Sequence, residues 1–78
     1  MDNQKKLKMT KGKFEEYLWQ RNNKQPIEYR KYDEFDYDKQ KSVPLTLYYN
    51  ADGHIGTWQR DSKGGYNCWT FEETLPNK

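Results

Sequence analysis

The dipeptide Asp52-Gly53, set between two segments of alternating polarity, constrains the fold of this chain more than any other feature. Residues 43–50 precede it and residues 54–60 follow it. Asp-Gly favours a tight turn between antiparallel strands, because both central residues of such a turn need a positive φ. The sequence therefore predicts a β-hairpin, with Asp52 and Gly53 as its two loop residues.

Turn and strand signals continue on both sides of this hairpin. The Asp-Ser-Lys-Gly-Gly run at residues 61–65 predicts a second turn, and residues 66–73 a third strand. Residues 27–32 alternate in the manner of a strand, and the alternation continues through Phe35 and Tyr37. Residues 38–42 read as a loop. The sequence thus predicts three or four strands joined by short connections.

One helix is predicted near the N-terminus. Thr10 is a suitable N-cap, and helix-forming residues follow from 11 to about 22. The apolar stripe of this helix has the spacing i, i+3, i+4 and i+7, at Phe14, Tyr17, Leu18 and Arg21. We expect an α+β domain over residues 10–75, with the N-terminal helix packed on one face of a three- to four-stranded antiparallel meander. Residues 1–9 are expected to form a basic flexible arm and residues 76–78 a tail.

Composition limits the size and the setting of this domain. Its 78 residues are enough for one domain, and 17% of them are aromatic against 32% hydrophobic, so we expect a core built largely from rings. The single cysteine, Cys68, excludes a disulfide within the chain. The sequence contains no long apolar run of the kind found in signal peptides or membrane spans. We therefore expect a soluble cytoplasmic protein, without membrane contact.

Charge is distributed unevenly along the chain. Residues 1–31 carry nine cations against four anions, whereas residues 33–38 carry four anions and no cation. Runs of this kind are most often solvated surface. They nevertheless mark a basic region and an acidic patch for any binding partner.

The predicted turns also assign side chains to the two faces of the sheet. With Asp52 and Gly53 in the loop, Leu47 lies opposite Trp58, and Trp58 opposite Cys68; opposed residues share a face. The helix is then expected to cover Val43, Leu45, Leu47, Tyr49, Trp58 and Cys68. The other face is expected to carry Thr46, Tyr48, Ile55, Thr57, Asn67, Trp69 and Phe71. A single helix covers only one face, so this second face is predicted to be a contact surface, unless residues 24–38 or Trp19 fold over it.

Catalytic and metal-binding patterns are missing from the sequence. His54 and Cys68 are predicted to lie about 13 Å apart along adjacent strands, too far for a nucleophile–base pair. We expect His54 to be a solvated turn residue and Cys68 a small buried hydrophobe. The acids between Asp33 and Asp38 lack the glycine and the distal glutamate of a calcium loop. We predict no enzymatic activity, no cofactor and no metal.

Binding is the function that remains, and a partner protein is favoured over a nucleic acid. The candidate site residues are Tyr48, Trp69 and Phe71, with Arg60 and Lys63 beside them, and Phe35, Asp36 and Tyr37 as a second edge. The alternative is single-stranded nucleic acid bound by the same aromatic and basic residues. A pI of 8.6 is low for a nucleic-acid-binding domain. A homodimer formed through the exposed face is a further possibility.

The short chain, rich in Lys, Asn and Tyr, resembles the accessory proteins of phages and mobile elements in low-GC bacteria. Many of those proteins inhibit a host or defence protein. The resemblance is one of overall composition, with no motif behind it. It implies a stoichiometric inhibitor working in a host cytoplasm and assigns no residue a role.

Overall fold

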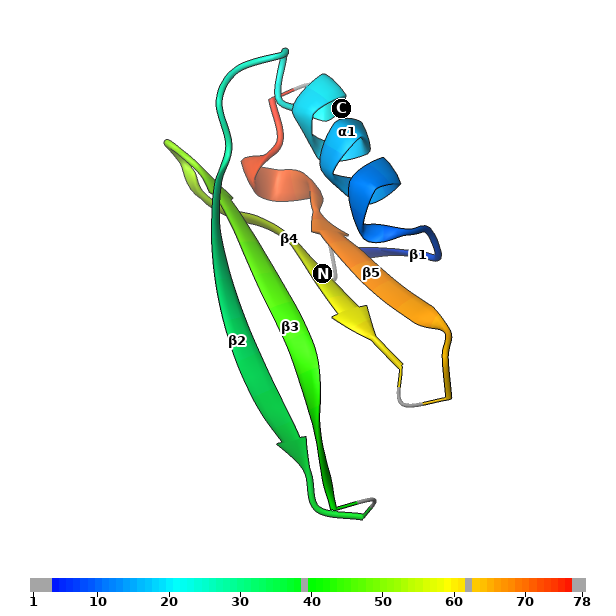
Figure 1. Ribbon diagram of the computed structural model, residues 1–78. Coiled ribbons are helices and arrows are strands. Elements are labelled where there is room, and N and C mark those ends of the chain that lie inside the picture. Colours follow the sequence, from blue (N-terminus) through cyan, green and yellow to red (C-terminus); the bar gives the residue numbers. More distant parts are fainter. Residues whose placement is uncertain (1–3, 39, 62, 77–78) are drawn as a thin grey trace.

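The computed structural model describes residues 4–38, 40–61 and 63–76, without the side chains of Glu34 and Asp36. They form a five-stranded antiparallel sheet with one α-helix on one side (Figure 1). The elements are β1 (Gln4–Leu7), α1 (Lys11–Arg21), β2 (Glu28–Asp36), β3 (Lys41–Asn50), β4 (Gly53–Arg60), β5 (Tyr66–Phe71) and the short 3-10 helix η1 (Glu72–Thr74). The strand order is β1-β5-β4-β3-β2. The α+β class is confirmed, but the sheet has five strands where three or four were predicted.

The additional strand comes from the region predicted to be a flexible arm. Gln4–Leu7 pairs antiparallel with β5, and Leu7 lies opposite Cys68. Leu7 also packs against the core. Three of the four residues in this strand are polar, so its sequence carried no strand signal, and it forms because β5 offers it an unpaired edge. Residues 1–3 of the predicted arm lie outside the described residues.

The helix α1 begins and ends where the sequence predicted. Phe14 and Leu18 from its stripe are fully buried, while Tyr17 packs against the core from the side. At the C-terminal end, Asn22 is buried, and its side-chain amide donates hydrogen bonds to the carbonyls of Gln25 (3.2 Å) and Pro26 (3.4 Å). These bonds satisfy the buried amide and fix the path of the chain from α1 toward β2.

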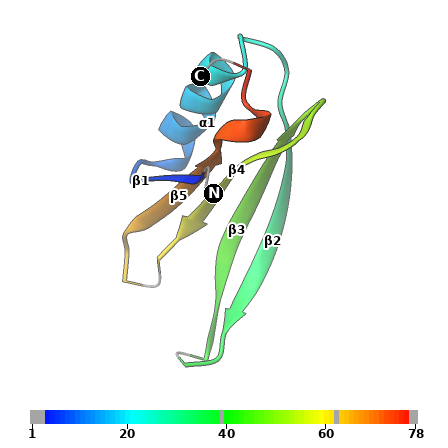
Figure 2. The same ribbon diagram turned by 180° about the vertical axis from the view of Figure 1, so that it is seen from behind.

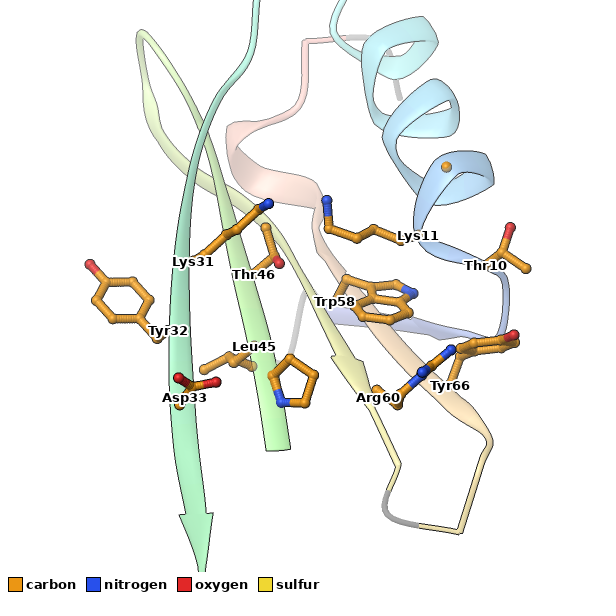
Figure 3. Close-up of a pocket in the computed structure, with 12 residues that line it drawn as sticks. Thr10, Lys11, Lys31, Tyr32, Asp33, Leu45, Thr46, Trp58, Arg60 and Tyr66 are labelled. Atoms are coloured by element: carbon orange, nitrogen blue, oxygen red, sulfur yellow. The ribbon is translucent and has the colours of Figure 1, made fainter. Parts of the chain in front are cut away.

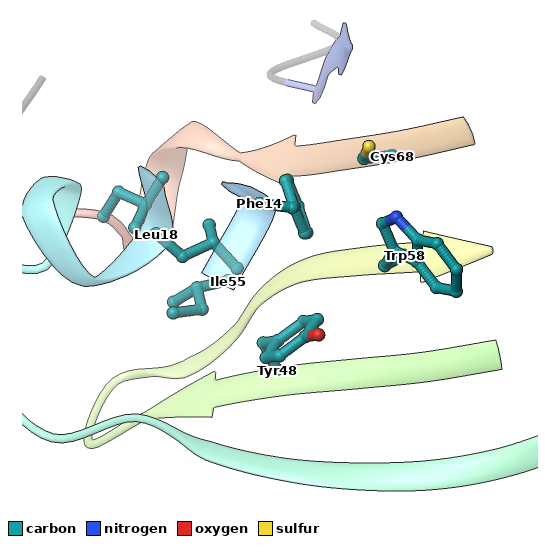
Figure 4. Packing of buried hydrophobic residues seen from close by; sticks show 7 residues of the cluster. Phe14, Leu18, Tyr48, Ile55, Trp58 and Cys68 are labelled. Carbon is teal, nitrogen blue, oxygen red and sulfur yellow. The ribbon is translucent and has the colours of Figure 1, made fainter. Parts of the chain in front are cut away.

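The core lies between α1 and one face of the sheet (Figure 4). It is built largely from rings and branched aliphatic side chains: Phe14, Leu18, Tyr48, Ile55, Trp58, Cys68 and Leu75. Phe14 meets Tyr48 edge to face, with 5.7 Å between ring centroids. A Cβ on Gly56 would lie only 3.0 Å from Leu18 and 3.1 Å from Phe14. The missing side chain of Gly56 therefore lets the helix approach β4 closely.

The loop of the β3–β4 hairpin lies one residue earlier than predicted. Asn50 pairs with Gly53, so the loop residues are Ala51 and Asp52, and Gly53 opens the return strand with φ 131°. The physical cause is Asn50: its side-chain oxygen accepts the backbone N–H groups of Asp52 (2.8 Å) and Gly53 (3.1 Å). An irregularity between Tyr48 and Tyr49 then shifts the pairing again.

This irregularity, and not the move of the loop, reverses the predicted faces of β3. The face covered by α1 carries Thr46, Tyr48, Gly56, Trp58, Cys68 and Thr70, which alternate with the opposite set along the paired strands. The opposite face, called here the open face, carries Val43, Leu45, Leu47, Tyr49, Thr57, Asn67, Trp69 and Phe71. The predicted pairs Trp58–Cys68 and Thr57–Trp69 are confirmed. The predicted exposure of Ile55 is wrong, since it is buried in the core.

The helix does not cover the whole of its own face. At about 1.5 Å per residue its 11 residues span about 16 Å, whereas the molecule measures 38 Å along its longest axis. In Figures 1 and 2 the β2–β3 hairpin extends well beyond the end of α1. A part of the covered face therefore lies beside the helix and not beneath it.

Candidate binding surface

The open face has no helix over it in the part of the chain that the structure describes. The α1 helix lies on the other side of the sheet, and Arg21 holds η1 on that side through an ion pair of 2.8 Å with Glu72. Residues 28–36 extend the sheet as strand β2, and Trp19 lies on the helix side, in a hollow shared with Tyr29 and Tyr48. The alternative in which residues 24–38 or Trp19 cover the second face is therefore wrong.

Three stacked rings form the centre of the aromatic part of the open face. His54 lies between Tyr49 and Phe71, with centroid distances of 5.2 Å and 4.3 Å. Its Nε2 atom is 3.0 Å from the hydroxyl of Thr57. Burial lowers the pKa of His54, against a smaller opposing effect of a backbone hydrogen bond at Gly56. The prediction that His54 is a solvated turn residue is wrong: its ring is a neutral packing element.

Aliphatic side chains and cations surround these rings. Leu45, Leu47 and Trp69 are half-buried on the same face. The guanidinium of Arg30 lies 5.0 Å from the ring centroid of Tyr49, and the ammonium of Lys6 lies 6.0 Å from that of Trp69. We call the set Leu45, Leu47, Tyr49, His54, Trp69 and Phe71 the open-face patch. Aromatic and aliphatic groups with arginine at the margin are the composition of protein interfaces.

Tyr48, a predicted contact residue, is not part of this patch. It is 1% exposed on the covered face, where its hydroxyl donates a hydrogen bond of 2.7 Å to the Glu15 carboxylate. Burial and this bond raise the pKa of Tyr48. Although burial opposes it, the bonds from Lys11 and Tyr48 lower the pKa of Glu15. The irregularity in pairing between Tyr48 and Tyr49 is what moves Tyr48 from the predicted surface into the core.

Arg60 and Lys63, predicted to flank the aromatics, lie elsewhere. Arg60 is at the end of β4 on the helix side, with its guanidinium 5.9 Å from the ring centroid of Tyr66. Lys63 is in the exposed β4–β5 turn, where its backbone N–H donates to Asp61 at 3.0 Å. Trp69 and Phe71 are therefore the predicted aromatic residues that the open face retains.

The predicted second edge is a separate exposed aromatic pair. Phe35 is 44% exposed and Tyr37 79% exposed, and their rings meet edge to face at 4.9 Å. They lie at the far end of the β2–β3 hairpin. The backbone of Asp36 pairs with Lys41, while its side chain is not among those described. This pair is remote from the open-face patch.

Leu45, Leu47 and Tyr49 are the site residues that sequence reasoning assigned to the wrong face. The alternation along residues 43–50 was visible, but its orientation depended on the irregularity between Tyr48 and Tyr49. The side chain of Asn50 could have placed the loop one residue earlier, but no signal in the sequence marks the irregularity that sets the faces.

A catalytic pair between His54 and Cys68 is excluded by the sheet itself. His54 pairs with Tyr49 on the open face, while Cys68 pairs with Trp58 on the covered face. As predicted, Cys68 is buried, and burial raises the pKa of its thiol, which donates to the carbonyl of Met9 at 3.6 Å. Among the described residues, no group of three His, Cys, Asp or Glu is placed to hold a metal ion. Nor does any described helix have the length and apolar character needed to cross a membrane.

Comparison with known proteins gives no relative from which a role follows. No protein-family model, no curated protein and no solved structure matches the chain.

Proposed function

We propose that this chain is a non-catalytic binding domain that docks a partner protein on its open-face patch. The observation that carries the proposal is the contrast in cover: α1 and η1 lie on one side of the sheet, while Leu45, Leu47 and Trp69 on the other side are only half-buried. Apolar surface of this kind on a small domain marks an interaction site more often than it marks chance.

The composition of the patch favours a protein over a nucleic acid. Nucleic-acid platforms need stacking rings within a cationic groove. Here the centre of β3 is aliphatic, with Leu45 and Leu47, and the cations Arg30 and Lys6 stand at the margins over rings that they already contact. Such a surface loses little on desolvation when an apolar partner covers it.

Acting stoichiometrically on a host or defence protein is the specific role that we propose for this domain. A small rigid sheet face suits inhibition by occlusion, which needs affinity and shape alone. The compositional resemblance to accessory proteins of phages and mobile elements supports this role without identifying the target.

Paired tryptophan variants test the proposal. Trp69→Ala removes an anchor from the open-face patch, and Trp19→Ala removes a 41%-exposed tryptophan from the helix side. We expect the wild type and Trp19→Ala to capture the same protein from nuclease-treated host lysate, and Trp69→Ala to capture at least tenfold less. The captured protein is then purified and its complex measured by native mass spectrometry, with one copy of each chain expected.

Circular dichroism spectra must first show that both variants are folded. Equal loss of capture by Trp19→Ala and Trp69→Ala would contradict the proposal, as would retention of capture by Trp69→Ala. Sedimentation of the isolated protein tests whether the partner is a second copy of this chain. If the wild type is a dimer and Trp69→Ala is a monomer, the partner is a second copy.

A further inference from the structure

A groove on the helix side of the sheet shares one lining residue, Leu45, with the open-face patch. It has a volume of about 700 Å³ and lies beside the N-terminal end of α1, where the helix leaves its own face of the sheet uncovered. Its size falls within the range of about 300–1,000 Å³ that is typical of small-molecule sites. The lining residues used below are Lys11, Lys31, Asp33, Pro44, Trp58 and Arg60.

Cations converge on this groove from three elements. Lys11 comes from α1, Lys31 from β2 and Arg60 from β4. Figure 3 shows the amino groups of Lys11 and Lys31 pointing toward one another across one end, with Arg60 at the other end. The Glu15 carboxylate bonds Lys11 at 2.6 Å and also interacts with Lys31, so one negative charge stands against two positive ones, and the net positive charge left at this end of the groove favours a further anion.

Nearby carboxylates offset these charges only in part. Lys11 is paired with Glu15 at 2.6 Å, and Asp33 is the one carboxylate among the described lining residues. Asp33 stands on the β2 side, away from Lys11 (Figure 3). The N-terminal turn of α1 contains no acidic residue, and the Thr10 side chain does not cap it. The positive end of the helix dipole therefore adds to the field of the two lysines.

The floor of the groove is apolar and formed by rings. Trp58 is fixed in place: its indole N–H donates to the carbonyl of Met9 at 3.0 Å, and its ring is 5.8 Å from that of Tyr66. Pro44 adds a second flat apolar surface. Since these residues belong to central strands, the floor has no free strand edge for a peptide backbone. The site thus suits a ligand recognised by a planar ring and a negative charge.

From this combination we infer that the groove binds a nucleoside phosphate, either free or as one unit of a single-stranded nucleic acid. The phosphate lies at the Lys11–Lys31 end, and the base lies over Pro44 and the exposed edge of Trp58. Asp33 offers an acceptor for an amino or hydroxyl group of the ligand. Only 5% of Trp58 is exposed, so the base contacts its edge and does not stack on its full face.

A matched pair of charge reversals tests this inference. Lys31→Glu changes the groove, while Arg30→Glu makes the same change of charge at the neighbouring residue, whose side chain lies on the open face. Nuclear magnetic resonance titrations follow the Trp58 indole signal, assigned with Trp58→Phe. The probes are AMP, UMP, an eight-residue oligothymidylate, inorganic phosphate and an eight-residue glutamate peptide.

We expect the Trp58 signal to shift with a mononucleotide or the oligonucleotide, and Lys31→Glu to weaken that binding at least tenfold, against less than twofold for Arg30→Glu. A shift with mononucleotides identifies the free ligand; a shift with the oligonucleotide alone identifies the strand. The inference would be overturned if neither the mononucleotides nor the oligonucleotide shifted the Trp58 signal, or if inorganic phosphate shifted it equally. It would also be overturned if the glutamate peptide shifted the signal more strongly, or if Lys31→Glu and Arg30→Glu weakened binding equally. Thermal unfolding of both variants verifies that they fold. If Lys31→Glu does not fold, Arg60→Gln takes its place as the groove variant.

Discussion

The two faces of the sheet carry the same kinds of side chain, but these stabilise the fold on one face and remain accessible to solvent on the other. Phe14 and Trp58 on the covered side are buried in the core, whereas Phe71 and Trp69 on the open face are only half-buried. Side-chain type alone therefore does not decide which aromatic residues stabilise this fold. Cover by α1 decides it, because a single helix can bury only one face of a sheet.

This contrast separates stability from binding within one small domain. Residues beneath α1 hold the fold together, and their loss costs free energy of unfolding. Residues on the open face contribute less to folding and remain available for a partner. Substitutions of one residue type on the two faces measure that division directly.

The largest expected effect is that of removing the same ring from each face. Phe14→Ala leaves a cavity between α1 and the sheet, and we expect the free energy of unfolding to fall by about 3–5 kcal/mol. Phe71→Ala removes a half-buried ring with no helix packed over it, and we expect a smaller loss of about 1–2.5 kcal/mol, because only the buried part of the ring returns to water. Urea unfolding followed by circular dichroism measures both. Equal losses would break the distinction between the faces.

A smaller effect is expected from adding one methyl group at a glycine. In Gly56→Ala the new Cβ would meet Leu18, Phe14 and the carbonyl oxygen of Trp69 at 3.0–3.1 Å, so we expect a loss of about 1–3 kcal/mol from overpacking. Gly12→Ala meets nothing within 4 Å and is expected to gain up to about 1 kcal/mol of helix stability. Thermal unfolding compares the two variants, and a neutral Gly56→Ala would show that α1 is not packed closely on β4.

Much of this division could be predicted from the sequence. The bounds of α1, its buried stripe at Phe14 and Leu18, and the pairing of Trp58 with Cys68 all follow from periodicity and turn chemistry. These features are local, since each depends on residues a few positions apart. That is why propensity and spacing were sufficient for them.

The faces of β3 could not be predicted, because they depend on a β-bulge next to the turn that the sequence pattern does not mark. Asn50 closes the turn and also donates hydrogen bonds to Asn22 (2.9 Å) and to the carbonyl of Thr74 (2.8 Å). It thereby joins the end of α1, the hairpin and the segment after η1. Moving a two-residue loop by one position leaves the same residues of β3 and β4 on a common face, so it is the irregularity between Tyr48 and Tyr49, where the register skips Ile55, that exchanged Tyr48 for Leu47 at the surface.

The smallest effects are expected from pH, which titrates the two faces separately. The folded protein binds a proton at His54 less readily than the unfolded chain does, so this part of the stability is present above pH 6.5 and is lost as the pH falls below it. Glu15 on the covered side also has a lowered pKa, so its contribution is lost only below pH 4.5. Its side chain is 40% exposed, and solvent screening limits this contribution to about 1 kcal/mol or less.

Unfolding free energies measured from pH 8 to pH 3 should therefore fall in two steps. His54→Phe keeps a ring between Tyr49 and Phe71 and is expected to remove the upper step. Glu15→Gln is expected to reduce the lower step but not abolish it, because the pKa of Glu72 is also lowered by its bonds with Arg21 and Thr70, which outweigh burial. Loss of the upper step in Glu15→Gln would show that the two faces are coupled.

The pairing of β1 with β5 has a consequence for how the protein matures. Gln4 lies opposite Phe71, and Leu75 completes the core. During synthesis β1 emerges from the ribosome well before β5 exists, and it waits unpaired until β5 has been made. Closure of the sheet is therefore a late, long-range step, of the kind that slows folding relative to domains with local contacts.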